Sequence, residues 1–327
     1  MRRGAATLVV AAVATIVAVG LLEVLARVFF PGFDPSGRIA FTHAVGDRLV
    51  LAPPNVDLRQ RKNTGDYDVA VRINRHGLRD PRDIAEAAAD DIVVVGDSFA
   101  WGWGVATGRR FSDLLEPLTG RRVFNLSAPA DLDGYRDLLD HARALGARTG
   151  QIVLALCMEN DLGDYDAPDE PSGHGMRWDW RGWLEHHSAA YLLFAAVVHQ
   201  TPPLRAVAVA LGLVTPNLAG IPRHTFSRAV VESSAQRVAG LARDRRLLVV
   251  VIPSRALWVG ANRDVEDQVH VAFVAALARA GLDVLDMRPL LESDGAPLSH
   301  HFVNDGHWNE AGHRLAAGAI AARLARP

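Results

Sequence analysis

The sequence predicts an α/β protein, built as a three-layer α/β/α sandwich around a mainly parallel sheet. From residue 91 onward, short apolar runs alternate with longer segments of helical spacing, as in proteins whose parallel strands are joined by helices. The first of these runs is continuously apolar, which is typical of a strand buried on both faces. The 327 residues are 49% hydrophobic, so the chain can form a large core.

Five apolar runs are the predicted strands of this sheet, and they cover residues 92–95, 123–126, 152–158, 247–252 and 282–285. Helices are predicted over residues 109–118, 135–145, 265–280 and 310–324. Asn309 is the expected N-cap of the last helix. The single cysteine, Cys157, lies in the third run, where we expect a small buried side chain; a reactive thiol is the alternative.

The first 30 residues have the character of a membrane anchor. Arg2 and Arg3 precede an uncharged apolar run over residues 5–22, and about 18 residues at a helical rise of ~1.5 Å give roughly 27 Å, close to the bilayer core. A cleaved secretory signal is the alternative, but its weak candidate cleavage site, residues 18–20, lies inside the apolar run. We favour an uncleaved anchor that leaves Arg2 and Arg3 in the cytoplasm and the catalytic domain on the extracytoplasmic side.

Two further parts are predicted after this anchor. Residues 31–90 form a lead-in, in which Tyr67 begins a strand of alternating residues that we expect to cover the edge of the main domain. Residues 91–327 form the main domain. Its rhythm is interrupted over about residues 163–223, where two apolar runs are each too short to cross a bilayer. Our first interpretation is a helical insertion packed on the domain, and the alternative is a membrane-facing element or a lid.

The overall charge and the histidine pattern give little support for a nucleic-acid partner or a metal site. The net charge of −2 does not indicate a nucleic-acid ligand, and we expect none. His300, His301 and His313 lie close together in the sequence, so a metal site is conceivable, but the chain has no His-Glu-x-x-His spacing. We therefore expect neither a catalytic metal nor a cofactor.

One serine stands where an α/β sheet binds its ligands. Ser98 follows the first buried strand and a tight turn at Gly96, and free N–H groups at such a turn favour negative charge. A serine needs a base to become a nucleophile, and the base needs an orienting group. Asp305 and His307, just before the last helix, supply both. These residues predict an acyl-transfer enzyme; the alternative is that Asp305 and His307 only form the turn into that helix.

Four segments carry a resemblance to a known family. In chain order they are Gly96-Asp97-Ser98-Phe99, Asn125-Leu126-Ser127-Ala128-Pro129-Ala130, Glu159-Asn160-Asp161 and Asp305-Gly306-His307. They resemble, in the same order, the sequence blocks of the SGNH/GDSL hydrolase superfamily. The resemblance covers residues 91–327 and implies the flavodoxin-like α/β/α fold of that superfamily.

The resemblance also implies a role for each site residue. Ser98 would be the nucleophile, His307 the general base and then the acid, and Asp305 the group that orients the imidazole. The oxyanion would be bound by the Ser98 N–H, the Ala130 N–H and the Asn160 side-chain amide; for Asn160, a capping role in the turn after its strand is the alternative. Two features depart from the commoner pattern. Ala130 replaces a glycine, which would disfavour a positive φ, and Asp305 lies two residues before His307 instead of three.

The implied activity is that of a serine-dependent ester hydrolase that forms an acyl-Ser98 intermediate. Its substrates would be O-acyl groups, such as acetyl, on an envelope glycan or lipid. The Asp-x-His-Trp arrangement resembles branches linked to polysaccharide O-acetylation, so an O-acyltransferase acting on a polysaccharide hydroxyl is the alternative. A non-catalytic glycan-binding protein on the same fold is the second alternative. Independently of this choice, Trp101 and Trp103 could line a sugar-binding cleft, although packing is the simpler interpretation.

Overall fold

The protein is described by a computed structural model that covers residues 2–35, 38, 39, 41, 43–45, 49–162, 180–214, 225–242 and 245–326. The chain divides into two compact units. The smaller consists of Met1–Arg38, Arg61–Gly65 and Gly173–Thr215, and the larger of Ile39–Gln60, Asp66–Ser172 and Pro216–Pro327. The division into domains of residues 1–30, 31–90 and 91–327 stays a prediction.

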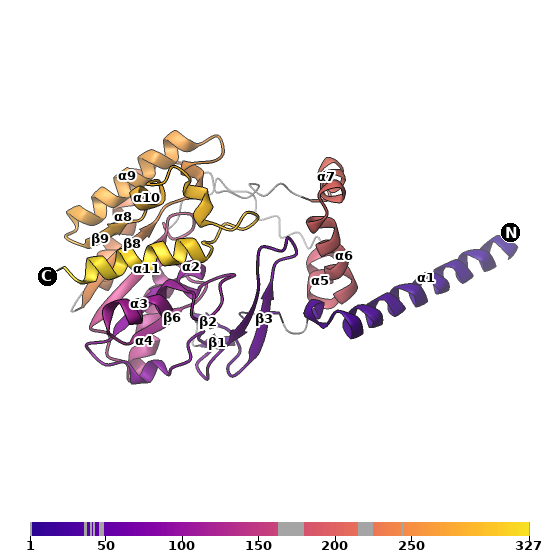
Figure 1. Cartoon of the computed structure of the whole chain (residues 1–327), viewed down its shortest axis with the longest axis horizontal. Coiled ribbons are helices and arrows are strands. Elements are labelled where there is room, and N and C mark those ends of the chain that lie inside the picture. Colours follow the sequence, from indigo (N-terminus) through magenta and orange to yellow (C-terminus); the bar gives the residue numbers. More distant parts are fainter. Residues whose placement is uncertain are drawn as a thin grey trace. The chain divides into compact units, whose positions relative to one another are not determined.

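The larger unit is organised around a five-stranded sheet (Figure 1). The strands lie in the order β6-β5-β7-β8-β9, and every neighbouring pair is parallel. Their bounds are β5 (Ile92–Gly96), β6 (Val123–Ser127), β7 (Gln151–Cys157), β8 (Arg246–Ile252) and β9 (Asp283–Asp286). Each agrees with a predicted apolar run to within one residue at either end. The chain reverses its direction of winding between β5 and β7, which is where doubly wound sheets bind ligands.

Helices cover both faces of this sheet, so the predicted three-layer fold is confirmed. Alternate side chains of the strands enter two separate apolar clusters, as strand geometry requires. One face packs against α4 (Leu132–Ala144), α8 (Arg228–Leu241) and α9 (Arg263–Arg279). The other packs against α2 (Ser98–Trp101), α3 (Phe111–Thr119), α10 (Arg288–Leu291) and α11 (Glu310–Leu324). The sequence did not predict α8.

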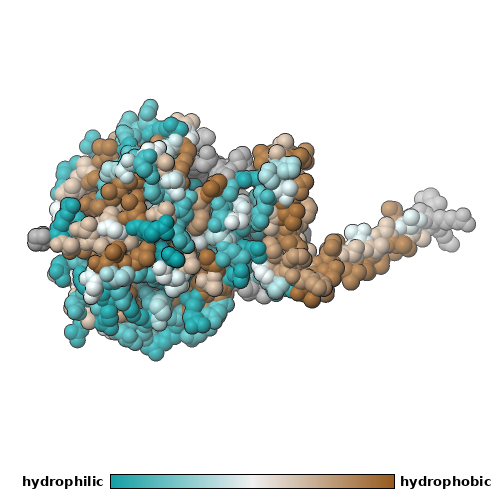
Figure 2. All heavy atoms as spheres, viewed as in Figure 1, coloured by the Kyte–Doolittle hydropathy of each residue, from teal (hydrophilic) through white to brown (hydrophobic). Residues whose placement is uncertain are grey.

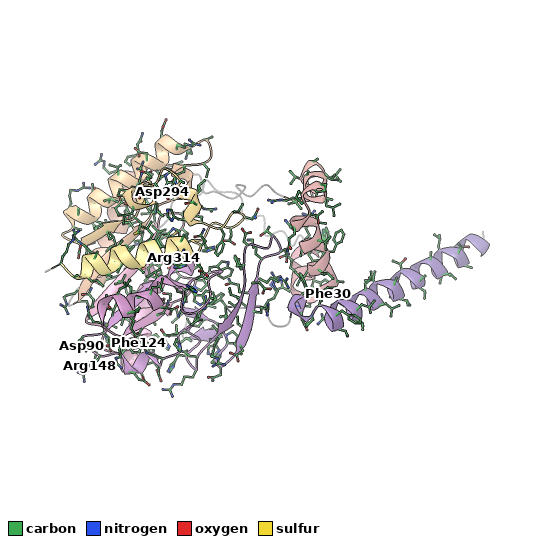
Figure 3. The ribbon with its side chains drawn as sticks, viewed as in Figure 1. Phe30, Asp90, Phe124, Arg148, Asp294 and Arg314 are labelled. Atoms are coloured by element: carbon green, nitrogen blue, oxygen red, sulfur yellow. The ribbon has the colours of Figure 1, made fainter. Side chains whose placement is uncertain are left out.

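The amino ends of the strands lie away from the serine. Asp90 and Arg148 precede β5 and β7 and lie near one another at this edge (Figure 3). The backbone N–H of Arg148 donates to the carbonyl oxygen of Ala87 at 2.8 Å, so the segments entering the two strands are joined. The opposite edge, where the strands end, therefore carries Ser98 and the turns that follow β6 and β7.

The lead-in contains more strands than the sequence predicted. β1 (His43–Val45) and β2 (Leu49–Leu51) pair in antiparallel fashion, and β3 (Asp57–Arg61) pairs with β4 (Asp68–Arg72). Only β4 corresponds to the predicted alternating strand. Val71 and Ile73 pack with Ala52 around the buried Trp101, which follows the serine turn. Trp101 is therefore a packing residue, which was the simpler of the two interpretations of the sequence.

The smaller unit contains four α-helices among its described residues: α1 (Arg2–Phe29), α5 (Trp180–His187), α6 (Ala189–Gln200) and α7 (Pro202–Ala210). The segment Ala6–Phe29 of α1 has a mean hydropathy of 2.6 and is the one described helix that is long and apolar enough to cross a membrane. A signal sequence has the same properties. The structure describes residues 180–214 of the interruption at 163–223, and the rest of that prediction lies outside the described residues.

Candidate active site

The serine is presented by a close-packed turn at the end of β5. A Cβ atom on Gly96 would lie 2.7 Å from the carbonyl oxygen of Ala155 and 2.8 Å from the Cβ of Ala100, so only glycine fits here. Asp97 is the N-cap of α2, and its carboxylate accepts the backbone N–H of Phe99 at 2.8 Å. Ser98 is thereby fixed at the first position of a helix, where N–H groups have no partner within the helix.

A chain of hydrogen bonds joins the three residues predicted to catalyse the reaction. The Nε2 atom of His307 lies 2.8 Å from the Oγ atom of Ser98. On the other side of the ring, Nδ1 is hydrogen-bonded to a carboxylate oxygen of Asp305, which also accepts the His307 backbone N–H at 3.1 Å. Because the carboxylate binds Nδ1, the neutral ring carries its proton there, and Nε2 is free to accept the hydroxyl proton. The spacing of two residues thus suffices to orient the imidazole.

A tyrosine from the lead-in completes the environment of Asp305, and the sequence analysis assigned it no such role. The Tyr67 hydroxyl donates to the second oxygen of Asp305 at 3.1 Å and accepts the indole N–H of Trp103 at 2.8 Å. Burial, together with the Asp305 charge, raises the pKa of Tyr67, so the phenol stays protonated and remains a donor. No local sequence signal could reveal this contact, which joins residues 238 positions apart.

Aromatic rings hold the imidazole in place. Trp103 stacks on His307 with ring centroids 5.6 Å apart and an interplanar angle of 29°. Phe99 packs against His307 at 5.1 Å and against the buried Trp308 at 5.3 Å. Trp103 therefore contacts the base itself. Such stacking restricts the orientation of the ring.

The residues predicted to bind the oxyanion follow the neighbouring strands. The exposed side chain of Asn160 follows β7, and its Nδ2 atom donates to the carboxylate of Asp97 at 3.2 Å. Burial raises the pKa of Asp97, whereas the hydrogen bonds from Phe99 and Asn160 oppose this rise. Asp97 therefore links the helix that carries Ser98 to the Asn160 amide. The oxyanion role of Asn160 stays a prediction.

Ala130 follows β6, which is the other neighbour of β5. Ala130 has a negative φ and thus an ordinary backbone conformation, since Asn55 is the one non-glycine residue with a positive φ among the described residues. Its methyl group packs over Gly134, where an added Cβ would lie 2.7 Å away. In the part of the chain that the structure describes, the N–H groups of Ser98 and Ala130 have no hydrogen-bond partner. The alanine is thus accommodated without strain.

An ion pair supports the loop that carries Asp305 and His307. Arg255 binds Glu159 through both its Nε and Nη2 atoms at 2.9 Å, and its backbone N–H adds a third contact at 2.8 Å. The guanidinium group lies against Gly306, where an added Cβ would approach it to 2.4 Å. A side chain at position 306 would therefore displace the guanidinium group of Arg255. Sequence reasoning missed Arg255, which carries no motif.

The other histidines of this region do not resemble metal ligands. Burial lowers the pKa of His301 to about 4 and that of His313 to about 3, so both are neutral. His313 uses its Nδ1 atom to accept the backbone N–H of Phe111 at 3.2 Å. No group of three His, Cys, Asp or Glu side chains within the described ranges could hold a metal ion. Cys157 is buried, and burial raises its pKa, so it is a packing residue and not a reactive thiol.

One family comparison is consistent with this fold and with the arrangement of these residues. Residues 223–327 match the family model described as the SGNH hydrolase-like domain of acetyltransferase AlgX. The resemblance to the SGNH/GDSL hydrolase superfamily is thereby confirmed. The comparison with curated proteins found no match.

Several solved structures are similar to this chain. One is a lipolytic G-D-S-L family protein from Veillonella parvula, with 14% identity, a TM-score of 0.44, and coverage of 72% of this chain and 99% of that one. Another is the catalytic domain of peptidoglycan O-acetyltransferase A from Streptococcus pneumoniae (13%, TM-score 0.36, coverage 73% and 94%). A third is an acetylxylan esterase from Geobacillus stearothermophilus (10%, TM-score 0.40, coverage 73% and 95%). At these identities and TM-scores, the likeness adds nothing to the assignment of an activity.

Proposed function

We propose that this protein is a serine-dependent ester hydrolase that acts on O-acyl groups, such as acetyl, of an envelope glycan or lipid. The observation that carries the proposal is the hydrogen-bonded chain from Ser98 through His307 to Asp305, at the carboxyl edge of the parallel sheet. A nucleophile, a base within 2.8 Å and a carboxylate on the far side of the ring are the parts that acyl transfer requires.

The first half of the reaction forms the acyl-enzyme. Ser98 Oγ attacks the ester carbonyl carbon while its proton passes to Nε2 of His307. Asp305 stabilises the imidazolium through Nδ1. The carbonyl oxygen becomes an oxyanion, which the N–H groups of Ser98 and Ala130 and the Asn160 amide would bind. The tetrahedral intermediate then collapses, His307 protonates the leaving alcohol, and the acyl group remains on Ser98.

The second half releases the acyl group. Water takes the place of the leaving alcohol, and His307 removes its proton as the oxygen attacks the acyl carbon. The same oxyanion donors act again, because this step passes through a second tetrahedral intermediate. Its collapse returns the proton from His307 to Ser98 and liberates the carboxylic acid.

Transfer of the acyl group to a carbohydrate hydroxyl is the second candidate. Two observations favour it: the Asp-x-His-Trp arrangement, and the match of residues 223–327 to a domain named for an acetyltransferase. The chemistry differs only in the acceptor, since a sugar hydroxyl would replace water in the second half. Trp103, which stacks on His307, would then stand beside the acceptor.

The N-terminal helix supports the proposal of a membrane-anchored enzyme with its catalytic domain on the extracytoplasmic side. The segment Ala6–Phe29 is long enough for a span, and Arg2 and Arg3 precede it, which favours a cytoplasmic N-terminus. If the helix is retained, membrane-fraction protein keeps the full-length mass. A mature protein that starts near Leu21 would contradict the anchor.

The activity is tested with the detergent-solubilised full-length protein. p-Nitrophenyl acetate turnover is followed with and without an oligosaccharide acceptor, for the wild type, Ser98→Ala and the control Ser233→Ala, whose hydroxyl lies on the exposed side of α8. Ser98-dependent release that ignores the acceptor indicates a hydrolase. Release that the acceptor accelerates, with acetyl appearing on the sugar, indicates a transferase. Wild-type turnover equal to that of Ser98→Ala would contradict both and leave the glycan-binding alternative.

A further inference from the structure

Two helices of the smaller unit expose large apolar side chains at helical spacing. On α6, Phe194 and Val197 are 66% and 48% exposed. On α7, Leu204 and Val207 are 46% and 58% exposed, and Leu211, directly after the helix, is 67% exposed. Residues three or four positions apart share one face of a helix, so each helix carries an apolar stripe that faces outward. Figure 2 shows brown, hydrophobic surface over these helices.

Apart from Leu192, the buried side chains of the same helices are alanines, which are smaller than the exposed ones. On α6 the buried residues are Ala189, Leu192 and Ala196, and on α7 the buried residue is Ala208. A helix of a water-soluble domain normally turns its large apolar residues inward and its polar residues outward. The reverse arrangement is expected where the outer surface meets lipid, because lipid tails are as apolar as the side chains and small residues let helices pack closely.

α6 is fixed to the apolar helix α1 by a charged residue of that helix. The carboxylate of Glu23 accepts the hydroxyl of Ser188 at 2.8 Å and the backbone N–H groups of Ala189 and Ala190 at 3.0 and 3.1 Å. These groups form the N-terminus of α6, which attracts negative charge. Arg27 binds the same carboxylate at 2.7 Å. The N-terminus of α6 is therefore bound to α1 at the position of Glu23 along that helix.

The position of Glu23 along α1 defines that level. Ala6, where the apolar segment begins, precedes Glu23 by 17 residues, which corresponds to about 26 Å along a helix. A bilayer core is about 30 Å thick, so Glu23 would lie at its far boundary and Phe30, labelled in Figure 3, just outside it. α6 and α7 pass the hydropathy test together but bend by 99° between them, so they do not form one straight span.

We propose that α6 and α7 form a membrane-docking surface, whose apolar stripes lie in the interface of the bilayer leaflet that α1 leaves. This inference depends on the proposed anchor. Trp180 and Trp183 on the adjoining α5 are 52% and 48% exposed, and tryptophan is enriched at the boundary between membrane and water. The occupant of the stripes is lipid, because the helix bound to their N-terminal end is itself long and apolar enough to be a span. The docked helices hold the smaller unit against the membrane.

The proposal is tested with the full-length protein in phosphatidylcholine and phosphatidylglycerol vesicles. Single cysteines are introduced by Phe194→Cys or Val207→Cys in the stripes, Val13→Cys in α1, and Arg143→Cys on an exposed site of the larger unit. Each is labelled with the fluorophore NBD, and quenching by lipids that carry a nitroxide on the acyl chain is measured. Because native Cys157 is buried, unsubstituted protein measures the background labelling.

The expected result is about a twofold loss of fluorescence at positions 194 and 207, since an interfacial helix lies ~5–10 Å below the headgroup boundary. Position 13 is quenched and position 143 is not. Quenching at position 13 alone overturns the docking surface and leaves the anchor intact. If neither position 13 nor positions 194 and 207 are quenched, both the anchor and the docking surface are contradicted. NBD self-quenching between copies, without lipid quenching at 194 and 207, shows that a second chain covers the stripes and also overturns the proposal.

Discussion

Replacement of Asn160 by alanine separates its proposed catalytic role from a structural one. The side chain is exposed and its Nδ2 atom makes one hydrogen bond, to Asp97. Loss of one oxyanion donor typically lowers kcat by about 10²–10³, which corresponds to about 2.7–4 kcal/mol of transition-state stabilisation. We expect a decrease of this size in Asn160→Ala, with KM changed far less, because the donor acts on a charge that develops only in the transition state.

The structural effect of the same substitution is expected to be small. Asp97 keeps the 2.8 Å hydrogen bond from Phe99, and water can reach the exposed position that the amide leaves. The free energy of unfolding should therefore fall by about 1 kcal/mol or less. Urea melts of the variant measure this quantity, and p-nitrophenyl acetate kinetics measure kcat.

A matched variant, Asn160→Gln, retains both amide hydrogens but moves them by one methylene group. We expect normal stability and a kcat still reduced at least about tenfold, because oxyanion donors must lie within 2.7–3.1 Å of the oxygen. If kcat in Asn160→Ala falls less than about threefold, the oxyanion assignment is wrong. If kcat falls only in proportion to the folded fraction, Asn160 acts through Asp97 alone.

Three other residues give predictions that are measured independently. Tyr67→Phe removes a hydrogen-bond donor to the Asp305 carboxylate. Because a hydrogen bond to a charged group contributes ~1.5–3 kcal/mol, we expect kcat/KM to fall about tenfold or more. Unchanged kinetics would exclude a positioning role for Tyr67. Gly96→Ala forces a Cβ to 2.7 Å from the backbone of β7, so urea melts should show a loss of about 1–3 kcal/mol, whereas Gly318→Ala, with open space around it, should be neutral or slightly stabilising. Burial lowers the pKa of His313 from 6.5 to about 3, so between these values the unfolded chain binds more protons and stability falls as the pH drops below 6.5. At pH 5 this group alone lowers the free energy of unfolding by about 2 kcal/mol. Between pH 7 and pH 5, the wild type should therefore lose about 2 kcal/mol more of its free energy of unfolding than His313→Asn does. Equal losses in the two proteins would contradict the neutral buried imidazole.

The parts of the fold that the sequence predicted are those in which local pattern and burial agree. β5 is buried at every position, so its apolar run identified it directly. β3 contains Asp57, Arg59 and Arg61, and it forms through pairing with β4 and ion pairs such as Arg59–Asp68. Such a strand has no apolar signal of its own, and the sequence analysis therefore missed it.

The residues of the candidate site were predictable only where they lie in short motifs. Ser98, Asp305 and His307 carry recognisable chemistry within short motifs, and the structure brings them together. Tyr67 and Arg255 lie outside those motifs. They act through contacts between distant parts of the chain, and the type of a residue alone does not indicate its tertiary neighbours.

The long sequence separations within the site have a consequence for the timing of activity. Ser98 and His307 are 209 positions apart, and Tyr67 and Asp305 are 238 apart. A chain is synthesised from its N-terminus, so the nucleophile exists long before its base does. By the proposed mechanism, a chain that still lacks His307 has no base to activate Ser98. If the larger unit is exported as we propose, acyl-transfer activity would begin only after the C-terminal segment has joined the rest of the unit.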